Sequence, residues 1–394
     1  MHRKRTLSAR ARGVLRMAEE RVLAINPGST STKIGVFTRA GAEWTATIRH
    51  GDEEVRRFAG QPMLARLGYR AGVIAEALDA AGVREKNFAA TVGRGGMLPP
   101  IPCGTYVVDE AMVEALQAAR RGEHASNLGA LLALAFAREA GVAAYTVDPV
   151  TVDEWQPVAR PSGSPLIERR AIGHALNTKA VARRFAREQG TRYEDLRLVV
   201  AHLGSGITVS AHAGGQMIDN NILGEGPFGP DRSGALPALE LIRLCFSGRF
   251  AQKELERRVF GEGGLFAYLG TRDLAEIEQR IAAGEAQARL VVEAMMAQIA
   301  KEAGAMATVL AGRVDALLLT GGMAYSARVV EGLRAALDWI APIRVYPGED
   351  ELEALAAGVF RVLDGEEQPK HLREAMLAPA EEKPTRAPLR FGID

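Results

Sequence analysis

Two short apolar runs separated by a polar segment predict a β-hairpin near the start of the chain. The apolar runs 22–25 and 34–37 flank a segment of Asn, Pro, Gly, Ser, Thr and Lys residues that is too polar and too long for a tight turn. Gly28 allows a ligand to approach the backbone, and the nearby polar groups are donors of the kind that a polyphosphate needs. These candidate phosphate-binding residues are Asn26, Ser29, Ser31 and Lys33. For this segment alone, an ordinary polar hairpin is the alternative.

Two later stretches repeat the arrangement. The apolar run 198–203 leads into a Gly/Ser turn and an outgoing run, and the apolar run 316–320 ends in two glycines before a helical pattern. The residues of these turns are Gly204, Ser205, Gly206, Gly321 and Gly322. This recurrence predicts a duplicated α/β domain with a nucleotide bound in the cleft between the halves. The sequence contains no Walker-type phosphate loop, so that route to nucleotide binding is excluded.

Helical periodicity fills most of the sequence between these strands. In the first half, the expected helices are 62–80, 109–120 and 127–140, and the expected strands are 87–92 and 143–147. In the second half, the expected helices are 170–189, 238–245, 273–283, 285–310 and 351–363. Residues 220–237 are rich in Gly and Pro, and such a long irregular loop within a compact domain is usually functional.

The two ends differ in composition from the core. Residues 1–21 carry basic side chains ahead of the first acidic residue, which indicates either an organelle transit segment or an overlong reading frame whose true start is Met17. The second interpretation is favoured, with a disordered basic tail expected in both cases. Residues 367–394 are expected to be a loose tail. The domain prediction is an N-terminal domain of residues 22–150 plus 350–366 and a C-terminal nucleotide-binding domain of residues 151–349.

Composition narrows the class of protein. The 394 residues are 47% hydrophobic and 25% charged, which is typical of a globular chain long enough for two domains. A formal net charge of +1 gives no basis for nucleic acid or an anionic membrane as a partner. Cys103 and Cys245 are expected to be buried thiols in a reducing compartment, and a cytoplasmic location is predicted. No apolar run approaches the ~20 residues that span a bilayer.

Several longer motifs resemble those of the acetate kinase family, within the actin-like ATPase superfamily. They are the hairpin from Asn26 to Lys33 and the segments 92–96, 101–106, 124–129, 147–150, 174–177, 202–206, 224–228, 232–234 and 320–322. The resemblance covers residues 22 to 363, which is nearly the whole core. Within the family, the sequence is most similar to the butyrate kinases.

This resemblance implies two duplicated actin-like (ribonuclease H-like) domains and a phosphotransferase with a carboxyl group as acceptor. The expected reaction is direct, Mg²⁺-dependent and reversible: butanoate and ATP give butanoyl phosphate and ADP. A kinase for isobutyrate, propionate or acetate is the nearest alternative, and a non-catalytic ATP-binding sensor on the same fold is a more distant one. The family also implies a small-molecule substrate and a homodimer or higher homo-oligomer.

Four residues are implied by the resemblance to act in the transfer. Arg94 and Arg232 lie in Gly-rich turns, and the matching family arginines bind the substrate carboxylate and the phosphoryl group in flight. Guanidinium groups suit this role because both reactants are anions that repel each other. Asp148 follows an apolar strand and matches the aspartate that positions Mg²⁺ and the acceptor, whereas His174 would donate a hydrogen bond to the transferring group. A turn-forming or structural role is the alternative for these last two residues.

Other implied residues contact the nucleotide. His202 would bind the nucleotide phosphates, together with Ser205 and Gly206 beside it. Gly321 and Gly322 would let the backbone pass close to the adenosine, although a turn at a helix start is the simpler interpretation of both glycines. Ser205 stands where acetate kinases usually carry Asn, so a contact made by that amide is lost or changed.

Asp148 and Glu351 are the implied metal ligands. Mg²⁺ in nucleotide sites takes one or two protein carboxylates plus waters. The assignment of Glu351 is open to a shift of register because Glu349 and Asp350 are adjacent to it.

The segment 98–102, which follows Arg94, is a candidate for the wall of the acyl pocket because its Leu, Pro and Ile residues are rigid and apolar. Each buried CH₂ contributes only ~0.8 kcal/mol, so the expected selectivity between neighbouring acids is about tenfold or less per carbon.

Overall fold

The computed structural model describes residues 20–83, 88–222 and 224–377. The described chain forms two compact units, which we call unit 1 (residues 20–151 and 350–377) and unit 2 (residues 152–349). Each unit is built on one mixed β-sheet with helices packed against it. The predictions for residues 1–19 and 378–394 lie outside the described residues.

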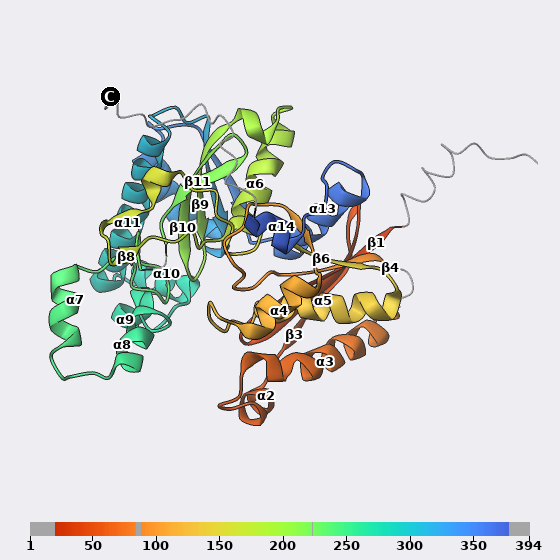
Figure 1. Cartoon of the computed structure of the whole chain (residues 1–394). Helices are drawn as coiled ribbons and strands as arrows, with labels where there is room; N and C mark the ends of the chain where they lie inside the picture. The colour runs from red at the N-terminus through yellow and green to blue at the C-terminus, as the bar shows by residue number, and fades with distance from the viewer. Residues whose placement is uncertain (1–19, 84–87, 223, 378–394) are drawn as a thin grey trace, which may run out of the picture. The chain divides into compact units, whose positions relative to one another are not determined.

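Unit 1 contains a six-stranded sheet in the order β3-β2-β1-β4-β6-β5 (Figure 1). The strands are β1 (Arg21–Pro27), β2 (Ser31–Thr38), β3 (Gly41–Arg49), β4 (Phe88–Gly93), β5 (Thr105–Val107) and β6 (Ala143–Val147). The helices are α2 (Asp52–Arg57), α3 (Leu67–Ala80), α4 (Glu110–Ala118), α5 (Asn127–Ala140), α13 (Glu351–Leu363) and α14 (Leu372–Leu377), and a 3-10 turn at Met63–Arg66 precedes α3.

The core of unit 1 follows from the alternation of side chains along β1. Leu23 and Ile25 point to one face and pack with Ile74 of α3 and Leu128 of α5. The helix α13 lies against β1, β2, β4 and β6. Gly358 allows this close approach, because a Cβ there would lie 2.5 Å from a Val147 methyl group. Helix α13 therefore belongs to unit 1 although it follows the last strand of unit 2.

Unit 2 contains a five-stranded sheet in the order β11-β10-β9-β12-β13 and a two-stranded β7-β8 hairpin. The strands are β7 (Pro161–Ser164), β8 (Ile167–Glu168), β9 (Arg197–Leu203), β10 (Ile207–Ala213), β11 (Gln216–Asn220), β12 (Ala316–Gly321) and β13 (Ile343–Pro347). The helices are α6 (Ala175–Glu188), α7 (Ala238–Cys245), α8 (Gln252–Val259), α9 (Gly264–Leu269), α10 (Leu274–Ala282), α11 (Ala286–Val309) and α12 (Ala327–Leu337).

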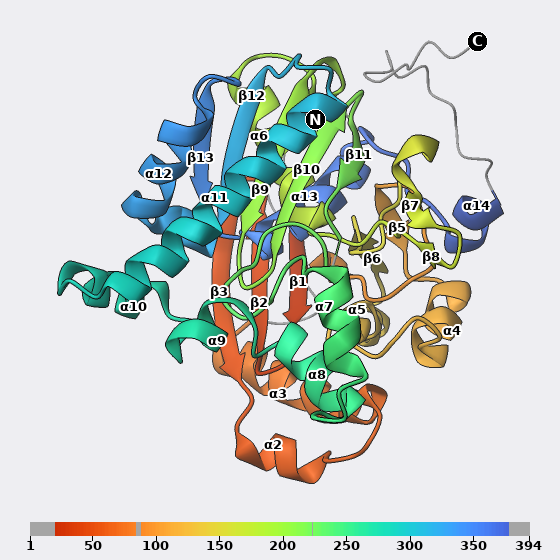
Figure 2. The same ribbon diagram turned by 90° about the vertical axis from the view of Figure 1, so that its left-hand side faces the viewer.

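The central strands of unit 2 are buried on both faces. In β9, Val199 and Ala201 pack in the cluster that includes α11, whereas Leu198 and Val200 pack with α6. Figure 2 shows α11 crossing β9 and β10. Near-continuous apolar strands are the expected sequence of such a doubly covered sheet.

The two sheets repeat the same topology. In each unit, two antiparallel pairings are followed by two parallel ones: β3-β2-β1-β4-β6 in unit 1 corresponds to β11-β10-β9-β12-β13 in unit 2. Both hairpins predicted from the sequence, β1-β2 and β9-β10, are present. The predicted duplicated α/β architecture is therefore confirmed.

Three details differ from the sequence predictions. Helix α6 begins at Ala175 rather than 170, because residues before it are tied to the neighbouring loop by the Asn220 Nδ2–Ile172 O hydrogen bond at 3.3 Å. Cys245 is exposed and Cys103 is partly exposed, so the prediction that both are buried is wrong.

The segment 367–377 is also ordered, whereas the sequence predicts a loose tail. Lys370 extends the sheet edge, because its N–H donates to Thr105 O at 2.9 Å and its carbonyl accepts from Val107 N–H at 2.9 Å. The short helix α14 follows and buries Leu372 in the core of unit 1. Backbone pairing and one apolar anchor therefore order a segment whose composition is charged.

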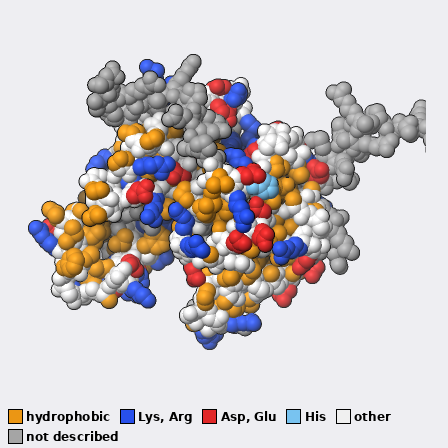
Figure 3. Space-filling view, viewed as in Figure 1, with side chains coloured by type: hydrophobic (Ala, Val, Ile, Leu, Met, Phe, Trp, Pro, Cys, Tyr) orange, Lys and Arg blue, Asp and Glu red, His pale blue; other side chains and the backbone are white. Residues whose placement is uncertain are grey.

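The surface of unit 2 carries apolar side chains over α7 (Figure 3). Leu239 is 70% exposed, Ile242 is 53% exposed and Phe246 is 87% exposed. Among the described residues, no helix combines the length and apolar character needed to cross a membrane.

Candidate functional site

The hairpin loop of unit 1, residues 28–30, joins β1 to β2. Asn26 and Lys33 are opposite each other where the two strands enter and leave this loop. The residues Ser29 and Lys33 are exposed, whereas Asn26 and Ser31 are partly buried. The predicted phosphate-binding residues of this hairpin therefore lie around one loop.

Three parallel strands of unit 1 end at the same edge of the sheet, and a candidate residue lies at each end. Asn26 is the next-to-last residue of β1, Arg94 follows β4 and Asp148 follows β6. The Arg94 N–H donates to Ile25 O at 2.9 Å, which keeps β1 and β4 paired up to this edge. Glu351, at the start of α13, accepts from Asn26 Nδ2 at 2.5 Å and forms an ion pair with Arg94. We call Asn26, Arg94, Asp148 and Glu351 the unit 1 site.

Glycine fixes the path of the turn that carries Arg94. A Cβ at Gly95 would lie 2.7 Å from Pro149 Cβ and 2.8 Å from Thr146 Oγ1. Contacts this short exclude a side chain. The turn therefore packs directly against the segment that carries Asp148, which brings the two predicted catalytic residues of unit 1 to neighbouring loops.

The Asp148 carboxylate is held in place by the backbone of Gly104. The residue is 1% exposed and has a positive φ of 39°, a conformation that Asp tolerates better than most residues. Its Oδ1 accepts from Gly104 N–H at 2.7 Å, and its own N–H donates to Gly104 O at 3.1 Å. These reciprocal bonds fix the direction of the side chain at the end of β6.

The donor set of the unit 1 site fits Mg²⁺ by its chemistry. Asp148 and Glu351 supply carboxylate oxygens, which hard cations prefer, and Mg²⁺ in nucleotide sites needs only one or two of them. In the described ranges, no group of three or more His, Cys, Asp or Glu residues is placed to hold a metal ion. The fit is therefore to an ion that completes its shell with water and phosphate, rather than to an all-protein metal site.

Two of the five residues proposed from the sequence as an acyl-pocket wall lie in the core of unit 1, whereas Pro100 and Pro102 are exposed and Pro99 is partly buried. Leu98 is 0% exposed and Ile101 is 1% exposed, and both pack with Tyr106 and Met112 in unit 1. Side chains enclosed in this way do not line an open pocket of the unit. The sequence could not reveal this, because an apolar run beside a catalytic residue has the same pattern in both cases.

In unit 2, a hydrogen bond to the Asn177 side chain determines which ring nitrogen of neutral His202 carries the proton. Asn177 Nδ2 donates to Glu349 O at 2.7 Å, which turns Asn177 Oδ1 toward His202 Nδ1 at 2.8 Å. Nδ1 must then carry a proton, so the Nε2 atom of the neutral ring is an acceptor. Nε2 lies 4.0 Å from Glu349 Oε1, a carboxylate that stabilises the ring when Nε2 is protonated.

His174 lies directly against His202. The two rings are stacked with their centroids 4.0 Å apart and their planes 15° apart. His174 is the N-cap residue of α6, and its Nδ1 is 2.8 Å from Thr208 Oγ1. The structure thus joins the two histidines that the sequence predicted independently.

Arg232 lies over the hairpin loop of unit 2, residues 204–206. A Cβ at Gly206 would overlap the Arg232 guanidinium group, so glycine is required for this contact. The guanidinium group also lies over the Phe260 ring, with 4.4 Å from Cζ to the ring centroid. Burial lowers the pKa of Arg232 from its usual value, although the Asp231 carboxylate 4.0 Å away acts in the opposite direction. We call His174, His202, Arg232 and the 204–206 loop the unit 2 site.

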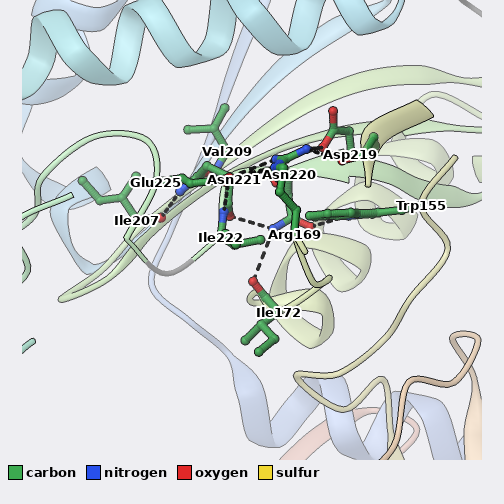
Figure 4. Close-up of polar contacts among 11 residues, drawn as sticks. Trp155, Arg169, Ile172, Ile207, Val209, Asp219, Asn220, Asn221, Ile222 and Glu225 are labelled. Atoms are coloured by element: carbon green, nitrogen blue, oxygen red, sulfur yellow. Dashed lines mark hydrogen bonds and ion pairs between the residues drawn. The ribbon is translucent and has the colours of Figure 1, made fainter. Parts of the chain in front are cut away.

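Two adjacent asparagines hold the segments of the unit 2 site together (Figure 4). Asn221 accepts from Val209 N–H at 2.6 Å through Oδ1 and donates to Ile207 O at 3.0 Å through Nδ2, which ties the 220–233 loop to β10. Asn220 donates to Ile172 O at 3.3 Å, close to His174 in the chain. The loop that leads to Arg232 is therefore fixed both to β10 and to the segment that precedes His174.

Arg169 completes this support (Figure 4). Its guanidinium group donates to both carboxylate oxygens of Glu225, reaches Asp219 at 3.5 Å and lies over the Trp155 ring at 4.7 Å. The contacts join the β8 end, β11 and the irregular loop. Apart from Asn220 at the end of β11, the described residues of 220–237 form no helix or named strand, so the prediction of an irregular loop is confirmed for them. Both side-chain hydrogen bonds and backbone bonds, such as Gly229 N–H to Arg232 O at 3.0 Å, give the loop its shape.

The two glycines after β12 differ in their surroundings. Gly321 has φ 91°, and a Cβ there would lie 2.5 Å from Leu203 O, so this position requires glycine to pack against β9. Gly322 is exposed and a Cβ there would meet nothing within 4 Å. Only the first glycine is explained by packing; a role of Gly322 near adenosine stays a prediction.

Glu349 and Glu351, two of the three adjacent acids after β13, have separate partners. Glu349 belongs to unit 2 and approaches His202, whereas Glu351 belongs to unit 1 and contacts Asn26. Sequence reasoning chose Glu351 for the site but gave no role to Glu349 or Asn177. The signal for Asn177 was its position three residues after His174, which places it on the same side of the first helical turn.

Comparisons with known proteins found a family match for part of the chain and solved structures of similar fold. The model of the Acetokinase family matches residues 166–341, which include the whole unit 2 site. The crystal structure of acetate kinase from Porphyromonas gingivalis is similar with a TM-score of 0.73 at 17% identity, covering 87% of this chain and 100% of that chain.

Two further solved structures have the same fold. A propionate kinase from Francisella tularensis subsp. tularensis gives a TM-score of 0.67 at 16% identity, covering 85% of this chain and 98% of that chain. Acetate kinase from Entamoeba histolytica gives a TM-score of 0.68 at 15% identity, covering 86% of this chain and 98% of that chain. The chain therefore has the actin-like fold of acetate and propionate kinases, and its residues 166–341 carry the sequence pattern of the Acetokinase family.

Proposed function

We propose that the protein is a carboxylate kinase, which transfers a phosphoryl group reversibly between ATP and a short-chain fatty acid. The observation that carries this proposal is the unit 2 site, where Arg232 lies over the 204–206 loop and two stacked histidines stand at the end of β9. Such an arrangement offers cationic and neutral donors to a phosphoryl group. The match of residues 166–341 to the Acetokinase family supports the carboxylate as acceptor.

Charge repulsion between the two anionic reactants is the reason that we assign a guanidinium group of each unit to the transfer. A carboxylate and a triphosphate repel each other, and transfer requires the reacting oxygens to be held in line. We assign Arg94 to the carboxylate or the phosphoryl group from unit 1 and Arg232 to the same task from unit 2. His174 donates to the transferring group, and His202 contacts the nucleotide phosphates, with its Nδ1 proton fixed by Asn177.

We assign Asp148 and Glu351 to Mg²⁺. A bound ion would neutralise charge on the nucleotide phosphates. Glu351 also forms an ion pair with Arg94 and accepts from Asn26, so the same carboxylate orients these two donors. Asp148 is oriented by its hydrogen bond from Gly104 N–H.

Butanoate is the acceptor that we propose, with isobutyrate, propionate and acetate as alternatives. The test is a hydroxamate assay on the purified full chain with ATP, Mg²⁺ and each acid in turn, compared by kcat/KM. Two additional buried CH₂ groups predict about a tenfold advantage of butanoate over acetate. A higher kcat/KM for acetate would overturn the butanoate assignment but keep the carboxylate kinase.

The same assay separates the enzyme from a non-catalytic ATP sensor. Binding of ADP without hydroxamate from any of the four acids would replace the proposed enzyme with the sensor. Direct transfer predicts inversion at phosphorus with chiral ATP, and retention would overturn it. The cytoplasmic location and the homo-oligomer stay predictions.

A further inference from the structure

One arginine of unit 1 is buried beneath the hairpin loop that the sequence predicts to bind phosphate. Arg70, in the first turn of α3, is 1% exposed and is among the largest fully buried side chains of the described chain. Its Nη1 donates to Gly28 O at 2.8 Å and its Nη2 donates to Ser29 O at 3.3 Å. A buried guanidinium group is costly unless hydrogen bonds satisfy it, so this placement requires an explanation.

A carboxylate and a histidine complete the network below the loop. Glu54 Oε1 accepts from Arg70 Nε at 3.0 Å, and Glu54 Oε2 lies 2.7 Å from His50 Nδ1. His50 Nε2 is 2.8 Å from Thr32 Oγ1, and the His50 backbone N–H donates to Thr30 O at 2.9 Å. The carbonyl groups of residues 28, 29 and 30 are therefore all held from the same protein network.

Peptide geometry turns this observation into a statement about the N–H groups. No cis peptide bond occurs in the described residues, and in a trans peptide the N–H points opposite to the preceding C=O. When Gly28 O and Ser29 O point toward Arg70, the N–H groups of Ser29 and Thr30 point away from it. Ser29 and Thr30 are exposed, so a ligand can reach the loop. Successive N–H groups on one side form an anion-binding concavity.

We propose that Arg70 is a positioning residue for nucleotide phosphate: it holds the carbonyl groups of the 28–30 loop inward so that the loop offers its N–H groups to the anion. The inference rests on the proposed function, because it takes the phosphates of ATP or ADP as the ligand. Arg70 acts through the backbone and does not touch the ligand. Because Glu54 neutralises the charge of Arg70, the role that we assign to Arg70 is hydrogen bonding rather than attraction of the anion by a net charge.

The first test is Arg70→Lys in the full chain, because lysine keeps the charge but cannot donate in the same fork to two carbonyl groups. Losing one charge-assisted hydrogen bond of this kind predicts a rise of about tenfold in KM for ATP and in the Kd of ADP measured by calorimetry. The KM for the carboxylate is expected to change less than about twofold, since only the nucleotide loop moves.

The matched control is Arg39→Ala in the same unit. Arg39 pairs with Glu20 at 2.8 Å and with Asp364 at 2.9 Å, so the variant loses ion pairs without contact to the loop. Its KM for ATP is expected to equal that of the wild type. Equal increases in both variants would overturn the positioning role and indicate a general loss of stability.

A second measurement needs no variant. Hydrogen exchange of the wild-type chain is expected to show slower exchange for the Ser29 and Thr30 amides when ADP is added, and unchanged exchange there would overturn the inference. Failure of the wild type to bind ADP at all would instead overturn the proposed function. Wild-type binding with an unchanged Kd in Arg70→Lys overturns the inference alone.

Discussion

The hairpin loops of the two units occupy the same position in matching sheets but are supported from different sides. In unit 1, Arg70 and His50 hold the carbonyl groups of the 28–30 loop from beneath. In unit 2, the 204–206 loop is covered by side chains instead: a Cβ at Gly204 would lie 2.8 Å from His202 Nε2, and Gly206 lies under Arg232. The loop sequences, Gly-Ser-Thr and Gly-Ser-Gly, reflect this difference.

Duplicated topology therefore does not imply duplicated chemistry. The first loop carries exposed hydroxyl groups and backbone N–H groups, with the buried Arg70–Glu54 ion pair behind them. In the second loop, glycine at positions 204 and 206 lets the His202 imidazole and the Arg232 guanidinium group lie close to the backbone. We infer that the unit 1 loop itself offers groups to nucleotide phosphate, whereas the unit 2 loop makes room for His202, which we assign to the nucleotide phosphates, and for Arg232, which we assign to the transfer.

The largest expected effect is the loss of Arg232. Arg232→Ala removes a cation from the unit 2 site, and the loss of a preorganised charge that stabilises a transition state predicts a decrease in kcat of about a thousandfold. The measurement is the hydroxamate assay at saturating ATP. Arg272→Ala is the control, because Arg272 pairs with the same Asp231 at 3.6 Å but is more than half exposed. A similar decrease in both variants would contradict the assignment.

Much of the fold could be predicted from the sequence because strand and helix periodicity determine it locally. The helices α5 and α7 begin and end where the pattern indicates. The start of α6 and the order of residues 367–377 could not be predicted in this way. Both depend on hydrogen bonds to distant residues, such as Asn220 to Ile172 and Lys370 to Thr105.

The candidate site shows the same limit. Residues in Gly-rich turns, such as Arg94 and Arg232, have a local signal because glycine excludes other side chains beside them. Arg70 has none: it lies 42 residues from Gly28 in an ordinary helical pattern, and only tertiary structure brings its guanidinium group to the loop. Asn177 and Glu349 likewise act through a histidine that is distant in sequence.

The second expected effect tests where the apolar segment after Arg94 lies. Because Ile101 is 1% exposed in the core of unit 1, Ile101→Ala is expected to lower the free energy of unfolding by about 3 kcal/mol. Denaturant unfolding measures this change. The order of preference among acetate, butanoate and isobutyrate is expected to stay the same. A changed order with unchanged stability would return this segment to the acyl pocket.

The third effect compares the glycines of the two loops. Gly206→Ala must displace Arg232, and a decrease in kcat of about tenfold is expected from the misplaced guanidinium. Gly28→Ala places its Cβ 3.1 Å from Ser31 O, a contact that a small shift relieves, so its kcat is expected to change less than about twofold. Equal decreases for the two variants would show that the loops are supported alike.

The smallest expected effect compares a buried histidine of each unit. His212 is 0% exposed, with Tyr193 Oη 2.6 Å from Nδ1 and Ser210 Oγ 2.8 Å from Nε2. Because Ser210 donates its proton to Val200 O, Nε2–H donates to Ser210 and Nδ1 accepts from Tyr193, so the ring is neutral. Burial and the charges of Lys179 and Arg183 lower the pKa of His212 well below its usual value.

In unit 1, a nearby carboxylate opposes the decrease in the pKa of His50. Burial and Arg70 lower the pKa of His50, but Glu54 raises it, whereas no carboxylate opposes the decrease in the pKa of His212. Below the unfolded-state pKa of about 6.5, His212 of the unfolded chain therefore binds a proton, whereas His212 of the folded chain stays neutral. The resulting stability is present above this pH and is lost as the pH falls.

The expected loss from His212 is about 1 kcal/mol in the free energy of unfolding between pH 7 and pH 5.5. His212→Gln keeps an acceptor and a donor without a titrating ring, so the stability of this variant is expected to fall by that much less over the same range. His50→Gln is expected to reduce the pH dependence by a smaller amount, because Glu54 already favours the protonated ring. Denaturant unfolding at both pH values measures the two differences, and a larger change for His50→Gln would reverse the comparison between the units.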